Sequence, residues 1–217
     1  MRIDVGGLVY KRNDLVDGKG PWFWLKADGG PDGGAWQGPK EDWEWDHKKN
    51  ILEHCKNFGV VVQAGGCLGM YPRLLADIFE TVYTFEPDPI NFYVLGLNTP
   101  YDNIIKTQAA LGAEDGFCSS IRRCPTNAGM HQIEENAGII PMIAIDSLSF
   151  PKIDLLFLDM EGYEIKALAG AYETIFEHKP TLIIEKPNQD VLDFIEPIGY
   201  KLAVQSRYDC VFTCNDK

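Results

Sequence analysis

A buried strand that runs directly into a glycine-rich turn is the feature that most constrains the fold of this 217-residue chain. Residues 60–64 (VVVQA) are apolar and mostly β-branched, residues 65–69 (GGCLG) form the turn, and an amphipathic segment follows at 70–79. This order predicts strand, tight loop and helix. In an open α/β sheet such a junction lies at the carboxyl edge of the strands, where ligands bind. We therefore expect a ligand pocket over this turn.

Strands and helices alternate along the rest of the chain. Apolar runs predict strands at 81–85, 104–108, 153–158 and 181–185, and helices are predicted at 46–57, 90–97, about 164–178 and 190–196. This alternation indicates an α/β protein with a doubly wound, mostly parallel sheet. The last two strands, 200–205 and 209–214, have hairpin spacing, so we expect an antiparallel C-terminal edge strand. Residues 113–142 are expected to be irregular, since Gly, Cys, Pro and Asn recur there.

The N-terminal segment, residues 1–45, differs in composition from the domain predicted at 46–217. It holds all five tryptophans of the protein, and seven glycines lie between Gly18 and Gly38. Glycine indicates a loop, whereas tryptophan is rare in disordered segments. We expect the segment to pack on the domain through its indoles, or to form a lid or substrate platform over the pocket. A contact between two copies of the chain in a homodimer is a further alternative.

The charge balance restricts the partners. The chain has 32 acidic and 20 basic residues, a formal net charge of −12. This disfavours nucleic acid and anionic membranes as partners, and it fits a soluble enzyme acting on small molecules. No apolar run approaches the length of a membrane span, and the first residues lack the apolar core of a signal peptide. We therefore expect a cytoplasmic protein whose six cysteines, which include no CxxC pair, are free thiols.

Four loops follow the predicted strands and should converge on one crevice. They are residues 65–69, 86–88, 109–112 and 159–164. Glu86 stands 21 residues after Gly65, at the end of the next strand. A carboxylate there can accept hydrogen bonds from both hydroxyls of a ribose. The alternative for Glu86 is a solvated loop acid or a helix cap.

The side chain at position 67 discriminates between two cofactors. Dinucleotide sites use the pattern G-x-G-x-x-G, in which the second glycine lets the backbone approach a pyrophosphate. Cys67 occupies that position here. S-adenosylmethionine has no phosphate and tolerates a side chain at this point. The turn therefore favours S-adenosylmethionine over NAD, and an NAD-type oxidoreductase is the second hypothesis.

Several motifs together resemble the FkbM-type S-adenosylmethionine-dependent methyltransferases. They are QAGGCLG at 63–69, FEPDPIN at 85–91, ALG at 110–112, IDSL at 145–148 and DLLFLDMEGYE at 154–164. The resemblance covers about residues 60–185, and F-E-P-x-P-x-N followed by D-x-E-G-x-E is its most specific part. It implies a class I methyltransferase fold, which is Rossmann-like and has seven strands, the last one antiparallel.

The resemblance also implies the site residues. The first turn would hold the methionine part of the cofactor, Glu86 the ribose, 109–111 the adenine, and 159–161 would lie beside the reacting methyl group. The implied cofactor-binding residues are Gln63, Gly65, Cys67, Gly69, Glu86, Pro87, Ala109, Ala110, Leu111, Asp159 and Met160. The family usually has an acid in place of Gln63 and often Asn in place of Cys67. An amide brings no charge to orient the cofactor's ammonium group, so either Asp159 carries more of that task or the affinity for the cofactor is lower.

The implied reaction is O-methylation of a hydroxyl on a small molecule or glycan, which produces S-adenosylhomocysteine. Removing the hydroxyl proton needs a base, and Asp159 and Glu161 are the candidates. Glu161 could instead favour the start of the following helix, as could Glu164. Asp146 either lines the site or caps a turn. No metal is expected, because nothing in the spacing makes these acids converge.

His131 lies in the insertion that is expected to be irregular. It is either a catalytic residue or a plain loop histidine. A third hypothesis for the whole chain is a non-catalytic cofactor-binding protein of the same fold.

Overall fold

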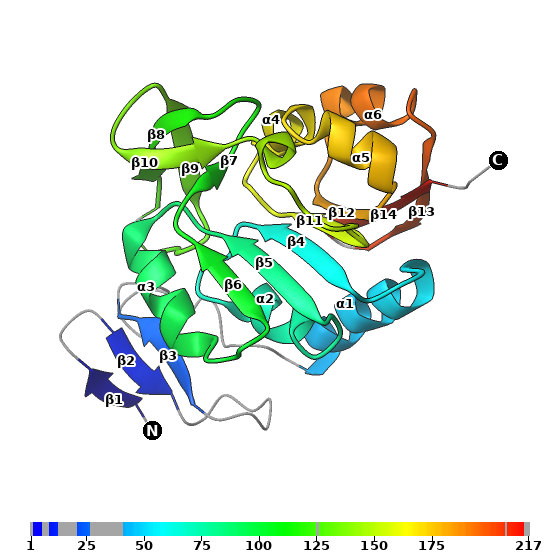
Figure 1. The fold of residues 1–217 in the computed structure, drawn as a ribbon. Coiled ribbons are helices and arrows are strands. Elements are labelled where there is room, and N and C mark those ends of the chain that lie inside the picture. The colour runs from blue at the N-terminus through cyan, green and yellow to red at the C-terminus, as the bar shows by residue number, and fades with distance from the viewer. Residues whose placement is uncertain are drawn as a thin grey trace.

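The computed structural model describes residues 2–5, 9–12, 21–26, 41–124, 126–206 and 208–214 (Figure 1). Its strands are β1 (Arg2–Val5), β2 (Val9–Arg12), β3 (Trp22–Leu25), β4 (Val60–Ala64), β5 (Thr81–Phe85), β6 (Ile104–Thr107), β7 (Ala110–Leu111), β8 (Gly116–Arg122), β9 (His131–Glu135), β10 (Ile140–Ile143), β11 (Leu155–Leu158), β12 (Thr181–Glu185), β13 (Tyr200–Gln205) and β14 (Asp209–Cys214). Its helices are α1 (Glu41–His54), α2 (Met70–Leu75), α3 (Pro89–Asn98), α4 (Glu164–Ala169), α5 (Tyr172–His178) and α6 (Gln189–Ile195), with a 3-10 turn at Ile145–Ser147.

The central sheet has seven strands in the order β13-β14-β12-β11-β4-β5-β6. Neighbours from β12 through β6 pair in parallel, whereas β14 is antiparallel to both β12 and β13. This confirms the predicted doubly wound, mostly parallel sheet with an antiparallel final strand. The final strand lies one place inside the sheet, so that β13 forms the edge. The order reverses between β4 and β11, which is the place where such sheets bind ligands.

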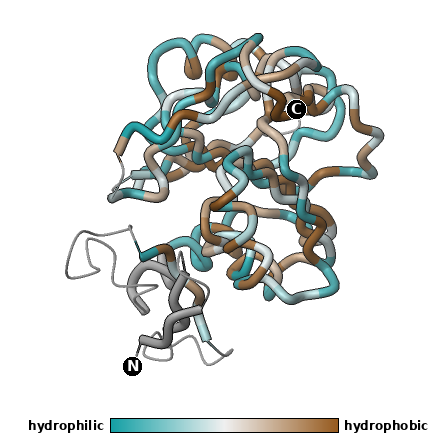
Figure 2. Tube along the Cα trace, turned by 90° about the vertical axis from the view of Figure 1, so that its left-hand side faces the viewer, coloured by the Kyte–Doolittle hydropathy of each residue, from teal (hydrophilic) through white to brown (hydrophobic). Residues whose placement is uncertain are grey.

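Both faces of the sheet are covered by helices. Val61 of β4 is fully buried in a cluster with Ile51 of α1 and Leu75 of α2. Val62, one residue on, points to the other face and packs with Leu168 of α4 and other apolar residues of α5 and α6. Figure 1 shows these two layers, and Figure 2 shows apolar chain running through the interior. Since successive side chains of a strand alternate between faces, a strand covered on both sides is apolar throughout.

Helix α1 begins and ends earlier than the predicted helix at 46–57. It is tied to the last strand by His47, whose Nε2 lies 2.8 Å from Oδ2 of Asp209. Both side chains are largely buried. His47 therefore has a structural partner in β14.

Residues 113–142 are not irregular, and that prediction was wrong. The insertion forms a four-stranded sheet in the order β7-β10-β8-β9, with β8 antiparallel to both of its neighbours. Most positions of β8 and β9 are only partly buried, so no alternation of apolar and polar residues marks these strands. Pairing between Ser120 and Ile133 and between Arg122 and His131 holds the two strands together. The insertion thereby carries His131 on a strand.

The N-terminal segment contributes a small antiparallel sheet in the order β1-β2-β3. Trp22 and Trp24 of β3 are buried against Leu68 and Val94 of the domain. Backbone groups of Phe23 also hydrogen-bond the amide of Asn98, at 2.7 and 2.9 Å. These two tryptophans therefore pack on the domain. Trp36 and the side chains of Trp43 and Trp45 lie outside the described residues, as does most of the predicted lid.

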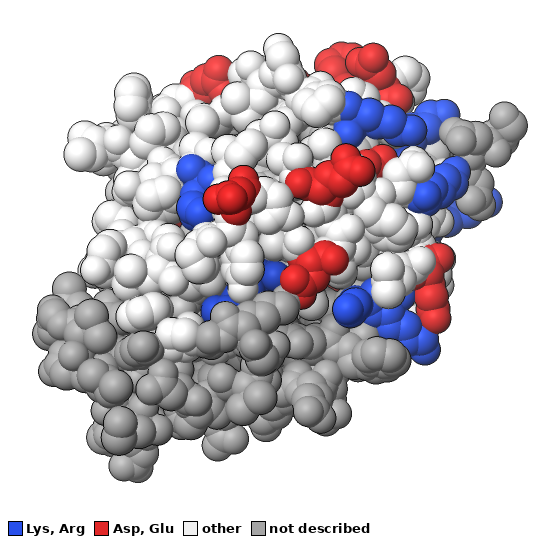
Figure 3. Space-filling view, turned by 60° about the horizontal axis from the view of Figure 1, so that its bottom comes forward, with Lys and Arg blue, Asp and Glu red and all other residues white. Residues whose placement is uncertain are grey.

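Three further features concern predictions from composition. No disulfide links the six cysteines, all of which lie in the described part of the chain. None of the described helices has the length and apolar character needed to cross a membrane. On the face drawn in Figure 3, acidic and basic side chains are interspersed among uncharged ones.

Candidate functional site

A cavity of about 260 Å³ opens at the carboxyl ends of β4, β5 and β11, with the insertion on one side. Most of the residues predicted for the cofactor and for catalysis line it. They are Gly65, Cys67, Glu86, Pro87, Ala109, Ala110, Leu111, Asp159, Met160 and Glu161. The fold therefore brings together residues as far apart in the sequence as Gly65 and Glu161, which are 96 positions apart. Gln63 and Gly69 are not part of the lining.

The turn after β4 requires glycine at its first position. Gly65 has a φ of 81°, and a Cβ built on it would lie 1.8 Å from the backbone oxygen of Asp159. The N–H groups of Gly65 and Gly66 both donate to the backbone oxygen of Phe85, at 3.2 and 3.0 Å. Any side chain at Gly65 would push the ends of β4 and β11 apart. The close approach of three strand ends therefore depends on this residue.

Glu86 forms the polar centre of the cavity. It is 4% exposed, its Oε2 accepts from the N–H of Cys67 at 2.7 Å, and its Oε1 accepts from the N–H of Asp88 at 2.9 Å. Burial raises its pKa to about 8, although the two N–H groups favour the charged form. In the ionised form each oxygen can accept more than one hydrogen bond, and donors from a ligand favour that form over the protonated one. The carboxylate can therefore accept hydrogen bonds from hydroxyl groups of a ligand.

The side chain of Gln63 hydrogen-bonds within the core and does not line the cavity. Its side chain is fully buried, its Oε1 accepts from Oγ1 of Thr84 at 2.6 Å, and its Nε2 donates to the backbone oxygen of Ala64 at 2.9 Å. Gln63 and Thr84 are also direct partners in the pairing of β4 with β5. The amide thus joins two central strands, and the cavity does not reach it.

Three carboxylates from two strand ends gather on the opposite wall. Burial raises the pKa of Asp159 well above its ordinary value, and the neighbouring Glu185 raises it further. Burial and Glu185 also raise the pKa of Glu161. Glu185 itself ion-pairs with Lys186 at the rim. Sequence reasoning missed Glu185, although an acid directly after the apolar run of β12 was a usable signal.

Two other predicted acids have structural roles. Oε1 of Glu164 accepts from the N–H groups of Met160 and Gly162, at 2.9 and 3.2 Å, and so closes the loop after β11. Asp146 accepts from two N–H groups in the first turn of α5, at 3.0 and 2.9 Å, and it is absent from the cavity lining. Within the described ranges, no group of three or more His, Cys, Asp or Glu side chains could hold a metal ion.

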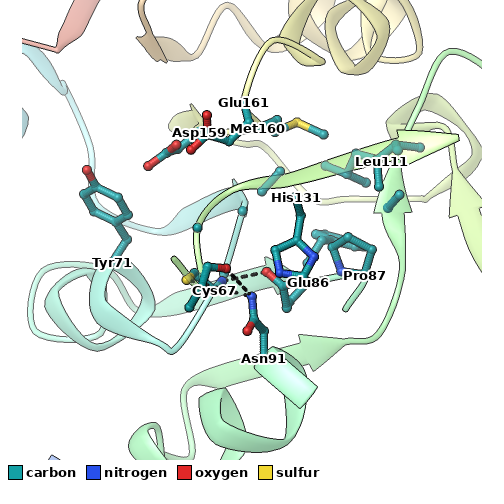
Figure 4. Close-up of a pocket in the computed structure, with 18 of the residues that line it drawn as sticks. Cys67, Tyr71, Glu86, Pro87, Asn91, Leu111, His131, Asp159, Met160 and Glu161 are labelled. Carbon is teal, nitrogen blue, oxygen red and sulfur yellow. Dashed lines mark hydrogen bonds between the residues drawn. The ribbon is translucent and has the colours of Figure 1, made fainter. Parts of the chain in front are cut away.

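The insertion and α3 supply further lining residues, which the sequence analysis did not assign to the cofactor. Asn91 donates from Nδ2 to the backbone oxygen of Ala128 at 2.8 Å, and its Oδ1 accepts from Arg122 at 3.0 Å. His131 lies over the loop that holds Glu86, as Figure 4 shows. It is part of a strand and lines the cavity, so the interpretation as a plain loop histidine was wrong. Tyr71 of α2 also lines the cavity.

Comparison with known proteins agrees with this geometry. The family model described as "Methyltransferase FkbM domain" matches residues 70–202. A crystal structure of methyltransferase FkbM from Methylobacillus flagellatus KT is similar, with a TM-score of 0.50 and 23% identity. The match covers 72% of this chain and 43% of that one, so this chain spans less than half the length of that protein.

Two further solved structures resemble the chain over most of both lengths. Precorrin-6y C5,15-methyltransferase from Geobacter metallireducens GS-15 has a TM-score of 0.52 and 11% identity, and the match covers 85% of this chain and 92% of that one. Precorrin 8w decarboxylase from Methanobacterium thermoautotrophicum has a TM-score of 0.50 and 13% identity, with 82% and 92% covered. At such identities the likeness shows the fold alone. Comparison with curated proteins gives no match.

Proposed function

Because this chain belongs to the FkbM methyltransferase family, we propose that it transfers a methyl group from S-adenosylmethionine to a hydroxyl group of a small molecule or glycan. The family and the fold are shown, and the methyl transfer, its cofactor and its acceptor are the proposed part. The observation that carries the proposal is the buried carboxylate of Glu86, which faces the cavity beside the turn at Gly65.

The lining fits an adenosyl group. Glu86 supplies acceptors for ribose hydroxyls, while Ala109, Ala110 and Leu111 are at most 1% exposed and offer an apolar wall to a flat base. Cys67 has a φ of 45°, and its side chain stands where a dinucleotide site needs glycine. These features favour a cofactor without a pyrophosphate.

The acids after β11 and β12 suit the reacting end. When bound, S-adenosylmethionine supplies an electrophilic methyl group on a positively charged sulfur. The transfer forms a carbon–oxygen bond to the acceptor and breaks a carbon–sulfur bond, while the hydroxyl proton passes to a base. A cation nearby favours the ionised form of the buried Asp159 and opposes the effect of burial on its pKa.

Glu161 is the better placed of the two candidate bases. Asp159 is partly buried and hydrogen-bonds to Glu185, so its carboxyl group is engaged. Glu161 is exposed, and a Cβ built on Gly129 would lie 3.8 Å from its Oε1. Its carboxylate thus lies near the insertion, on the solvent-exposed side of the cavity. We assign proton removal to Glu161 and a charge-balancing role to Asp159.

The experiment that tests the function is calorimetric titration with S-adenosylhomocysteine, the product of the cofactor. Wild type should bind it, and Glu86→Ala should lose most of that affinity, because the ribose acceptor is gone. The matched control is Glu177→Ala, which removes an exposed glutamate from α5. Binding of NAD without binding of S-adenosylhomocysteine would contradict the proposal. A mass-shift screen against glycans, lipids and peptides with S-adenosylmethionine then identifies the acceptor.

A further inference from the structure

One imidazole of the insertion lines the cavity with an unsatisfied nitrogen. The side chain of His131 is 9% exposed, and it lines the same cavity as Glu86 and Pro87. Figure 4 shows the ring beside these two residues. Among the described residues, no group hydrogen-bonds to its Nε2. Buried polar atoms are normally satisfied, so this nitrogen is a place where a ligand would complete the site.

The groups around the other ring nitrogen determine where the hydrogen lies. Nδ1 of His131 is 2.9 Å from Oγ of Ser120 and 3.5 Å from Oδ2 of Asp88. The hydroxyl of Ser120 can donate to Nδ1 or accept from it, and the negative charge of Asp88 nearby favours the tautomer with the hydrogen on Nδ1. Burial lowers the pKa of His131; the charge of Asp88 opposes this, and the charge of Arg122 adds to it. The lowered pKa favours the neutral ring, in which Nε2 is a buried atom whose lone pair no described protein group uses.

Asp88 connects this histidine to the loop of Glu86. Its Oδ1 caps α3 by accepting from the N–H groups of Ile90 and Asn91, at 3.0 and 2.8 Å. Its own N–H donates to Oε1 of Glu86 at 2.9 Å. One short loop thus holds the carboxylate of Glu86 and places the negative charge of Asp88 beside His131. The two acceptors are held on neighbouring parts of the same wall.

We propose that Nε2 of His131 accepts a hydrogen bond from one ribose hydroxyl of the adenosyl group, while Glu86 accepts from the other. The inference rests on the proposed function, since it concerns the same cofactor. Two neighbouring acceptors match the two donors of a vicinal diol, which ribose has and a deoxyribose lacks. The insertion therefore takes part in recognising the sugar, and His131 is a binding residue that contacts the ligand.

The test is calorimetric titration with S-adenosylhomocysteine and with its 2′-deoxy and 3′-deoxy analogues. His131→Phe keeps a ring and removes the acceptor, so affinity for S-adenosylhomocysteine should fall roughly 3- to 10-fold, the loss expected for one hydrogen bond. His131→Gln, whose Oε1 can replace Nε2, should restore part of it. His54→Phe, at the far end of α1, is the matched control and should bind as wild type does. Far-ultraviolet circular dichroism of each variant verifies that it is folded.

The analogues separate ligand contact from an indirect effect. Wild type should lose affinity for both analogues, and His131→Phe should be insensitive to the absence of one hydroxyl, because that contact is already gone. Undiminished binding by His131→Phe, or equal sensitivity of this variant to both missing hydroxyls, overturns the inference. If Glu86→Ala abolishes binding while His131→Phe leaves it intact, only the inference on His131 fails. If wild type does not bind S-adenosylhomocysteine, the proposed function fails with it.

Discussion

The carboxyl group of Glu86 should make the protein less stable as the pH rises. Burial raises the pKa of Glu86 to about 8 from an ordinary value of 4.5. Between these pH values the folded protein holds a proton that the unfolded chain has released. Stability falls with pH wherever the folded state binds more protons, here by about 1.4 kcal/mol per pH unit. The contribution of Glu86 is therefore largest at low pH and is lost as the pH rises toward 8.

Replacing Glu86 with Gln removes this titration while keeping the size of the side chain. We expect the free energy of unfolding of Glu86→Gln to rise relative to wild type by about 3 kcal/mol between pH 5 and pH 7.5, which is roughly 2.3 effective pH units at about 1.4 kcal/mol each. Asp159 and Glu161, whose pKa values are also raised, contribute equally to both proteins and cancel in the difference. The Gln variant should at the same time lose affinity for S-adenosylhomocysteine. The substitution would thus increase stability and decrease function.

Urea denaturation followed by tryptophan fluorescence, repeated across this pH range without ligand, measures the effect. The control is Glu177→Gln on the surface of α5, whose curve should run parallel to that of wild type. Parallel curves for Glu86→Gln and wild type, within about 0.5 kcal/mol, would refute the reasoning that burial keeps this carboxyl group protonated.

Three further predictions concern single residues of the site. Gly65→Ala should destabilise the fold by more than about 3 kcal/mol, because its Cβ would meet a backbone oxygen at 1.8 Å, whereas Gly96→Ala, with open space around it, should change stability by less than about 1 kcal/mol. Gln63→Leu should lower the free energy of unfolding by about 1–3 kcal/mol, because the hydroxyl of Thr84 on β5 loses its hydrogen-bond acceptor. The same substitution should alter affinity for S-adenosylhomocysteine by less than about twofold, because the amide does not line the cavity. Glu161→Gln should lower kcat by roughly 100-fold or more without weakening cofactor binding.

Thermal or urea denaturation of the two glycine variants decides the first prediction, and equal losses at both positions would contradict it. Calorimetry on Gln63→Leu decides the second, since a large loss of affinity would show that this amide contacts the cofactor. Methyl transfer to the acceptor found in the screen, measured against pH, decides the third. Unchanged turnover in Glu161→Gln would transfer the role of base to Asp159.

Local sequence patterns determined the central sheet. They also determined the part of the candidate site that is formed by loops at the carboxyl ends of its parallel strands. The apolar run at 60–64 predicted β4, and the spacing from Gly65 to Glu86 placed an acid at the end of the neighbouring strand. These inferences held because strand, turn and helix are local structures and the doubly wound topology brings strand ends to one edge. The same patterns failed for 113–142, where short strands with polar, half-buried residues leave no periodic signal.

The tertiary structure alone decided which polar residues line the cavity. Gln63 stands in the motif that the sequence assigned to the cofactor, yet pairing with Thr84 across two strands turns its amide into the core. His131 stands in an insertion without a motif, yet strand pairing with β8 and contact with Asp88 bring its ring to the cavity. In both cases the deciding contacts join residues distant in sequence. Local sequence patterns therefore determined at which edge of the sheet the cavity lies. Packing between strands that are distant in sequence determined which side chains line it.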